Sequence, residues 1–118
     1  MVEKMYEISM LYDFYGELLT PRQKSIMQYY YEENYSLGEI AVETGVSRQA
    51  VYDAVRKAEK SLHSYEEKLG LVKRFIQTES DIEKAEQAID EIISQYPDER
   101  AIVEKLVFVK NILGKLEE

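Results

Sequence analysis

The feature that most constrains the fold is a pair of helix-start signals, at Ser36 and Ser47, eleven residues apart. Ser36 is followed three residues later by Glu39, the capping-box pattern in which each residue satisfies a backbone N–H of the other. Ser47 is a second N-cap, and Gly45 before it can take the left-handed conformation that a tight turn needs. Apolar residues spaced as in two packed helices are Ile40, Ala41, Val46, Val51, Ala54 and Val55. Residues 36–60 are therefore predicted to form a helix-turn-helix.

The second helix of this pair is predicted to have an inner and an outer face. The inner stripe, with steps of four and three, is Val51, Val55, Ala58, Leu62, Tyr65 and Leu69. The outer face is polar near its N-terminal end, where such a helix meets base edges in the major groove. Arg suits guanine and Gln suits adenine, because each can make paired hydrogen bonds to that base. The predicted DNA-binding residues are Ser47, Arg48, Gln49, Tyr52, Asp53, Arg56, Lys57 and Lys60. The alternative is that these side chains only solvate a surface helix.

The net charge of −8 argues against a broad basic surface of the kind that nucleic-acid binders usually present. Residues 1–70 carry eight Lys/Arg and twelve Asp/Glu, and residues 71–118 carry seven and eleven, so each part contributes −4. Within residues 47–60, four basic residues oppose Asp53 and Glu59, which gives +2. This local patch is compatible with DNA binding but predicts weak non-specific affinity. It also leaves a protein partner open as the target of the face.

The rest of the chain is also helical in its pattern, and we expect an all-α, five-helix fold. The expected helices outside the helix-turn-helix span about residues 3–15, 20–31, 72–95 and 98–116, with caps at Thr20 and Asp98. The recognition helix is expected to continue to Leu69, so its last turns must pack on something beyond the helix-turn-helix. A polar stretch at 78–81 predicts a kink or an interruption in the following helix.

These elements suggest two parts: residues 1–70 as a helix-turn-helix DNA-binding domain and residues 71–118 as a C-terminal helical hairpin. The hairpin is more apolar than a lone surface hairpin should be. It either packs back on the N-terminal helices or pairs with the hairpin of a second subunit. We favour a symmetric homodimer, because an uncovered apolar patch of this breadth is a liability in a monomer.

Several classes of protein are not indicated. The chain has no cysteine, and it has neither a signal-peptide-like start nor an apolar stretch long enough to insert into a membrane. The single histidine, His63, is expected to be structural, and no phosphate loop, nucleophile elbow or cluster of metal ligands is present in the pattern. We therefore expect a cytoplasmic protein that is not an enzyme and needs no cofactor or metal.

Three stretches carry a family resemblance: Leu19–Gln23, Tyr35–Ala41 and Gly45–Val51. Together they resemble region 4 of bacterial sigma factors, in which the corresponding helix pair reads the −35 promoter element. Residues 47–53, with Glu59-Lys60 and 65–69, resemble more closely the YlxM family of small bacterial helix-turn-helix proteins. The similarity is strong over about residues 3–76. The chain differs from a sigma factor in lacking the other sigma regions and in its acidic balance.

The YlxM resemblance implies a regulatory role in the signal recognition particle pathway, because members of that family are encoded beside genes of the particle. The first expectation is a regulator that binds double-stranded DNA, with components of the particle as further partners. The main alternative is a protein-interaction module that uses the helix-turn-helix face to grip a component of the secretion machinery. A third possibility is binding to the RNA of the particle.

Overall fold

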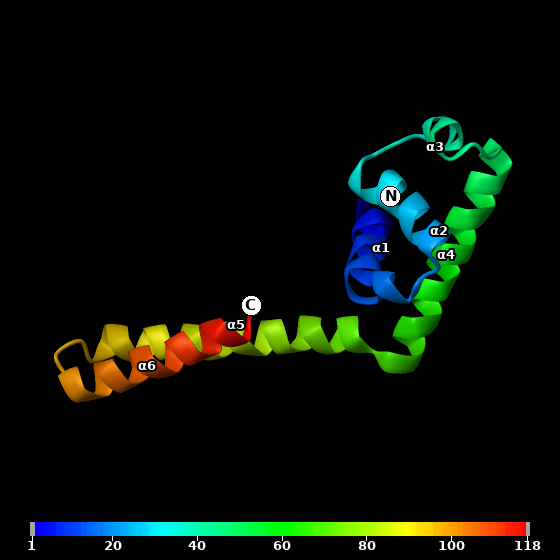
Figure 1. Ribbon diagram of the computed structural model, residues 1–118. Helices are drawn as coiled ribbons and strands as arrows, with labels where there is room; N and C mark the ends of the chain where they lie inside the picture. Colours follow the sequence, from blue (N-terminus) through cyan, green and yellow to red (C-terminus); the bar gives the residue numbers. More distant parts are fainter. Residues whose placement is uncertain (1, 118) are drawn as a thin grey trace. The chain divides into compact units, whose positions relative to one another are not determined.

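A computed structural model describes residues 2–117, which form six α-helices and two short helical turns, with no strand among them (Figure 1). The all-α prediction is confirmed, but the number five was wrong: the described residues form six α-helices, one for each of the segments expected from the sequence. Along the chain they are α1 (Val2–Tyr15), η1 (Gly16–Leu18), α2 (Pro21–Met27), η2 (Gln28–Glu32), α3 (Leu37–Thr44), α4 (Arg48–Leu69), α5 (Leu71–Gln95) and α6 (Arg100–Leu116). The chain divides into two compact units, Met1–Val72 and Lys73–Glu118.

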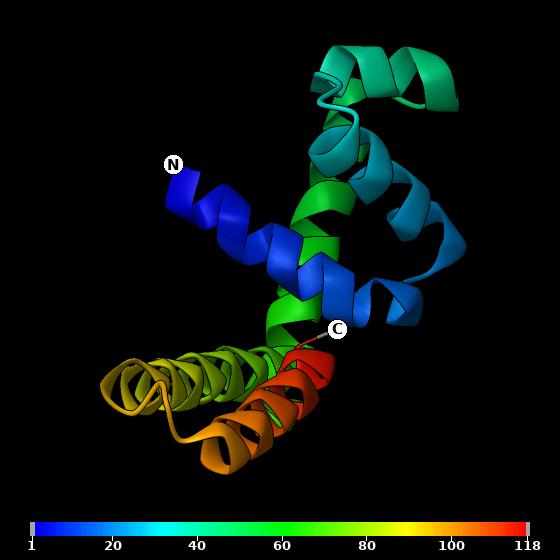
Figure 2. The ribbon, with the colours of Figure 1, turned by 90° about the vertical axis from the view of Figure 1, so that its left-hand side faces the viewer.

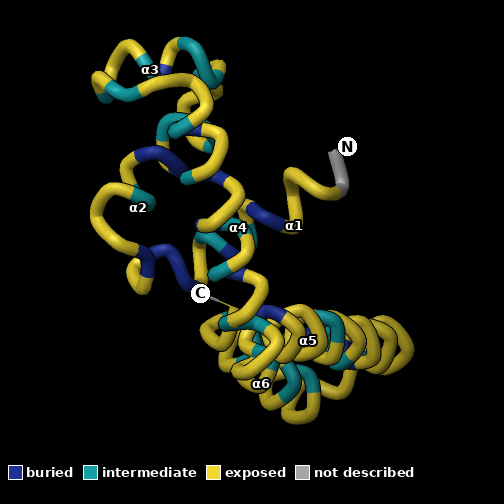
Figure 3. Tube along the Cα trace, turned by 90° about the vertical axis from the view of Figure 1, so that its right-hand side faces the viewer, coloured by how far each residue is buried: buried dark blue, intermediate teal, exposed yellow. Residues whose placement is uncertain are grey.

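The first unit is built around α4, which contacts α1, α2 and α3. Four residues of its predicted inner stripe are buried: Val51, Val55, Ala58 and Leu62. They share one hydrophobic core with buried residues of the other three helices and their connections, namely Ile8, Leu11, Tyr15, Leu19, Ile26, Met27 and Ile40 (Figure 3). The prediction that the long helix packs beyond the helix-turn-helix is therefore confirmed, and its partner is α1.

The inner stripe of α4 ends earlier than predicted. Tyr65 is partly buried, with its ring 6.0 Å from that of Tyr15, and its hydroxyl donates to the Leu18 carbonyl at 3.4 Å. Leu69, one turn further on, is 52% exposed, so its assignment to the stripe was wrong. The reason is that the contacts from the α1–η1 segment reach α4 as far as Tyr65.

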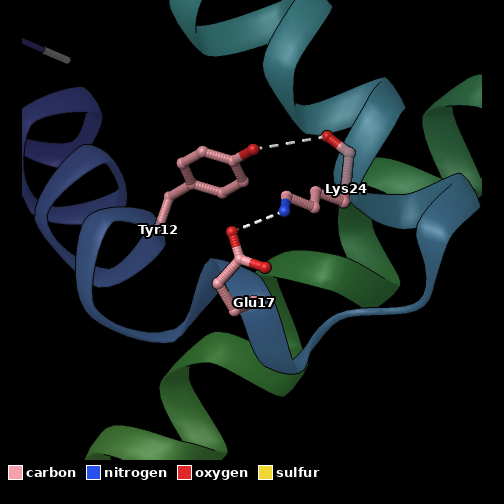
Figure 4. A network of polar contacts seen from close by, with 3 residues as sticks. All are labelled: Tyr12, Glu17 and Lys24. Atoms are coloured by element: carbon pink, nitrogen blue, oxygen red, sulfur yellow. Dashed lines mark hydrogen bonds and ion pairs between the residues drawn. The ribbon is translucent and has the colours of Figure 1, made fainter.

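The corner between α1 and α2 is closed by polar contacts around Tyr12 (Figure 4). The Tyr12 hydroxyl donates to the Lys24 carbonyl at 3.5 Å, and the Lys24 ammonium pairs with Glu17 at 2.5 Å. The predicted cap at Thr20 is confirmed, because its side chain accepts from the Gln23 N–H at 3.2 Å. Gly16 does not simply end α1 but begins η1, where a Cβ would lie only 3.1 Å from the Tyr12 ring.

The second predicted helix is divided, because α2 ends at Met27 and continues as the π-helical turn η2. The Glu33 N–H donates to the Gln28 carbonyl at 3.1 Å, which is the longer spacing of a π-turn. Asn34 then takes a left-handed conformation with φ 56°, which Asn tolerates better than most residues. This geometry redirects the chain into α3.

The first turn of α5 is capped by side chains from elsewhere in the first unit. After Gly70, with φ 63°, the Leu71 N–H donates to the Tyr15 hydroxyl at 3.1 Å. The Tyr15 hydroxyl in turn donates to Glu66 at 2.6 Å, and the same carboxylate oxygen accepts from the Val72 N–H at 3.0 Å. Two otherwise unsatisfied amides of the helix start are thereby paired.

The second unit is an antiparallel hairpin of α5 and α6, which run side by side (Figure 2). Ile82 and Ile89 are buried in it, and Lys110 of α6 pairs with Asp90 of α5 at 2.7 Å. α5 is continuous, so the interruption suggested at 78–81 is absent. The predicted cap at Asp98 was also wrong: a turn places Glu99 at the N-cap, and it makes no side-chain cap bond.

We predict that Gly45→Ala lowers the free energy of unfolding by about 1–2 kcal/mol, because a Cβ disfavours the left-handed conformation at φ 71°. Nothing lies within 4 Å of the added Cβ, so the penalty is conformational. Gly38→Ala is the matched control in the same unit, where the added Cβ makes only ordinary contact and should raise the helix propensity. Urea unfolding followed by circular dichroism measures both, and equal effects would contradict the assigned turn.

We predict that Tyr15→Phe lowers the melting temperature by several degrees, because the change removes the hydroxyl that joins Glu66 to the Leu71 N–H. Tyr65→Phe is the control, since its hydroxyl makes only a long bond to the Leu18 carbonyl. Thermal melts followed by circular dichroism would show the difference. A Tyr15→Phe variant that melts like wild type would mean that this cap contributes little to stability.

Candidate nucleic-acid interface

Local hydrogen bonds fix both helices of the predicted helix-turn-helix. The Ser36 side chain accepts from the Glu39 N–H at 3.1 Å, and the Glu39 carboxylate accepts from the Ser36 N–H at 3.1 Å. The N–H of Gly45 closes α3 on the Ala41 carbonyl at 2.9 Å, and the Ser47 side chain caps α4 by accepting from the Ala50 N–H at 3.1 Å. Both caps predicted for this motif are present, so each of its two helices begins at a defined residue.

All eight predicted DNA-binding residues are exposed, and seven lie along the outer side of α4. Ser47 precedes the helix, and its hydroxyl is already engaged as the cap. Two pairs are pre-ordered at a spacing of four residues: the Gln49 amide donates to Asp53 at 3.1 Å, and the Arg56 guanidinium donates to the Tyr52 hydroxyl at 3.2 Å. None of these side chains is needed for the core, so the face can bind a ligand without local unfolding.

Arg48 is positioned by the other helix of the motif. A Cβ on Gly38 in the first turn of α3 would lie 3.9 Å from the Cδ and Nε atoms of Arg48, so the arginine side chain extends over that turn. The sequence argument placed Arg48 on the surface but missed this support, because the capping signals of α3 say nothing about the neighbouring helix.

Glu59 of α4 is hydrogen-bonded by a tyrosine of η2. The Tyr31 hydroxyl donates to the Glu59 carboxylate at 3.1 Å. Burial raises the pKa of Tyr31 well above 10.0, and the nearby negative charge of Glu59 adds to the shift. The partners are 28 residues apart in the chain, and no sequence signal indicated the pairing.

The surroundings of α3 are acidic. The negative charge of Glu33 raises the pKa of Tyr35, with further contributions from burial and from Glu43 and Glu39. Tyr35 also stacks on Tyr29, with ring centroids 5.1 Å apart. The candidate interface thus combines a basic outer face on α4 with an acidic flank around Tyr35, and this juxtaposition was not predicted.

The outer face of α4 offers hydrogen-bond donors and cationic groups to a ligand. Over residues 2–117 no group of His, Asp and Glu side chains could hold a metal ion, and no helix there could cross a membrane. His63 lies elsewhere on α4, with its Nδ1 atom 3.7 Å from the Glu7 carboxylate of α1.

The sequence matches a known protein family over most of its length. The family model described as "Putative helix-turn-helix protein, YlxM / p13 like", UPF0122, covers residues 2–106. A UPF0122 protein of Listeria welshimeri is 53% identical over 79 residues, which make up 67% of this chain and 72% of the relative. A UPF0122 protein of Geobacillus kaustophilus is 49% identical over 89 residues, 75% of this chain and 81% of the relative. Another, of Lacticaseibacillus casei, is 43% identical over 105 residues, 86% of this chain and 87% of the relative. The resemblance inferred from the motifs is confirmed.

We predict that Tyr31 is among the last tyrosines to ionise. Its pKa is raised above 10.0 in the folded protein, so the stability that depends on its protonated form is complete below pH 10.0 and is lost as the pH rises toward the folded-state pKa. Ultraviolet titration of tyrosinate should lose its highest transition in Tyr31→Phe, while Tyr6→Phe, at an exposed site, should leave that transition in place. A wild-type titration with a single transition near 10 would contradict the Tyr31–Glu59 contact.

Proposed function

Because the chain belongs to the UPF0122 family of YlxM/p13-like helix-turn-helix proteins, we propose that it is a regulatory protein that binds double-stranded DNA through the outer face of α4. The observation that carries the proposal is the separation of the two faces of this helix. Its inner stripe is buried in the core, whereas the outer face is exposed and carries Arg48, Gln49, Tyr52, Asp53, Arg56, Lys57 and Lys60.

The proposed roles follow position along the helix. Arg48 and Gln49 lie in the first turn of α4, the part of a recognition helix that reaches base edges. Their side chains can make paired hydrogen bonds to guanine and adenine, respectively. Lys57 and Lys60 lie two to three turns further along, where contact with phosphate is the expected role. Asp53 is held by the Gln49 amide and so can orient it.

The proposal includes a homodimer through the C-terminal hairpin. Attraction to DNA by the whole molecule is weak, since its net charge is −8 and acidic side chains surround Tyr35. Two helix-turn-helix units on one particle would offset this, because linked sites gain effective concentration without new contacts. A dimer would favour an inverted repeat with half-sites about 34 Å apart or a multiple of that distance.

The biological setting that we propose is the bacterial cytoplasm and the signal recognition particle pathway, with no enzymatic activity. Its support is the likeness to the YlxM family described above. The acidic flank around α3 favours one second candidate, in which the same α4 face binds a protein or RNA component of the secretion machinery instead of DNA. The two candidates use the same side chains, so the ligand has to be found by experiment.

Selection from a random duplex pool decides between these candidates. DNA binding predicts enrichment of one sequence motif by the wild-type protein. Enrichment of no motif would contradict the proposal and favour the protein or RNA partner.

With an enriched duplex, we predict that Arg48→Ala and Gln49→Ala each weaken binding by about 1–3 kcal/mol and relax preference at one base position. Lys57→Ala and Lys60→Ala should weaken all sequences alike and flatten the dependence on salt. Lys84→Ala, on the hairpin, is the control for loss of a positive charge. Gel shifts at two salt concentrations measure these effects, and unchanged binding by the Arg48 and Gln49 variants would refute the assigned face.

A further inference from the structure

The two sides of the C-terminal hairpin differ in polarity. One side is an open groove between α5 and α6, and it contains the Lys110–Asp90 ion pair. The residues that line this groove are Glu86, Asp90, Ile93, Val107, Lys110, Asn111, Gly114 and Lys115. Five of these eight residues are charged or carry an amide, so this side of the hairpin can remain exposed to solvent.

The other side of α6 is apolar and exposed. Ile102, Val109, Ile112 and Leu116 follow one another at steps of seven, three and four residues, which places them on one stripe of a helix. Their side chains are between 43% and 63% exposed, and Phe108 beside them is 66% exposed. Ile92 of α5 and Tyr96, which directly follows the end of α5, are also exposed. Apart from Lys105, the stripe on α6 carries no charge.

We propose that a second copy of the same chain packs on this apolar stripe. The two α6 helices would be antiparallel about a two-fold axis near Val109. Together, the exposed side chains of Ile92, Tyr96, Ile102, Phe108, Val109, Ile112 and Leu116 present on the order of 600–800 Å². Each partner of a specific protein complex buries about 800 Å². The stripe together with Ile92, Tyr96 and Phe108 is therefore large enough to form a stable interface.

The stripe is complementary to itself, as a two-fold interface requires. Ile102 lies seven residues before Val109 and Leu116 seven residues after it, so antiparallel helices place each Ile102 opposite a Leu116.

The negative charge of the hairpin disfavours a lipid surface as the partner of the apolar stripe. Residues 73–118 contain seven Lys/Arg and eleven Asp/Glu, a net charge of −4. An amphipathic helix that lies on an anionic membrane is normally rich in Lys and Arg on its polar face. The inference rests on the dimer of the proposed function and not on what the helix-turn-helix binds, so failure to dimerise and failure to bind DNA are separate outcomes.

Cysteine cross-linking tests which side of the hairpin meets the second copy. The chain has no cysteine, so a single introduced thiol can form a disulfide only with the same thiol in another copy of the chain. Under mild oxidation, Val109→Cys should give mostly disulfide-linked dimers. Asn111→Cys, two residues away in the polar groove, should remain largely reduced. Cross-linking at Asn111 but not at Val109 would place the interface on the wrong side and overturn the proposal.

Light scattering on reduced protein measures the dimer without a cross-link. Wild type should have the mass of a dimer at micromolar concentration, and Val109→Glu with Ile112→Glu should raise the dimer dissociation constant at least a hundredfold. Asn111→Glu controls for an added charge on α6 and should stay dimeric. Circular dichroism checks that each variant keeps its helicity. A monomeric wild type, or a folded double variant that still dimerises as wild type does, would refute the proposal.

Discussion

The buried stripe of α4 is the interaction on which the first unit depends. Val51, Val55, Ala58 and Leu62 share one core with buried residues of α1, α2 and α3. A lone helix-turn-helix has few residues to bury, and its exposed outer face contributes nothing to the core. Because the recognition helix extends beyond the motif, the motif becomes part of a larger hydrophobic core. The outer side chains near its start are thereby held on a rigid element, as a binding site requires.

The electrostatics of this unit limit how it can bind nucleic acid. The cationic side chains gather on α4, and Tyr31 of η2 engages Glu59 of the same helix. The surroundings of Tyr35 are acidic, so a docked duplex would be attracted at α4 and repelled where α3 carries Glu39 and Glu43. Such an arrangement favours a restricted approach over general affinity for phosphate. It fits an interface whose binding depends on specific contacts and on more than one copy.

Much of this architecture could be predicted from local sequence signals. The caps at Thr20, Ser36 and Ser47 and the turn at Gly45 were found in place, because each depends on residues within four positions of one another. Predictions that depended on distant contacts were less successful. Leu69 fits the periodicity of the stripe, but no helix covers it there. Asp98 has the right chemistry for a cap, yet the turn places Glu99 in that position.

Most contacts that shape the candidate site could not be predicted from the sequence. Tyr31 with Glu59, and Tyr15 with Glu66, pair across 28 and 51 residues, and several other tyrosines and glutamates would have been equally plausible partners. The position of Arg48 over Gly38 likewise needs the angle between α3 and α4. The outer-face residues themselves could be chosen from the sequence, since helical periodicity alone separates them from the stripe. Their role as the ligand-contacting set remains a prediction.

The most direct test of the central claim is an NMR titration of isotopically labelled protein with duplex DNA at low salt. Binding through the outer face of α4 predicts that backbone amide shifts change mainly from Ser47 to Lys60, while the amides of α1 change little. A titration without shift changes, or with changes concentrated on α1 and absent from the start of α4, would contradict the claim that this face binds DNA.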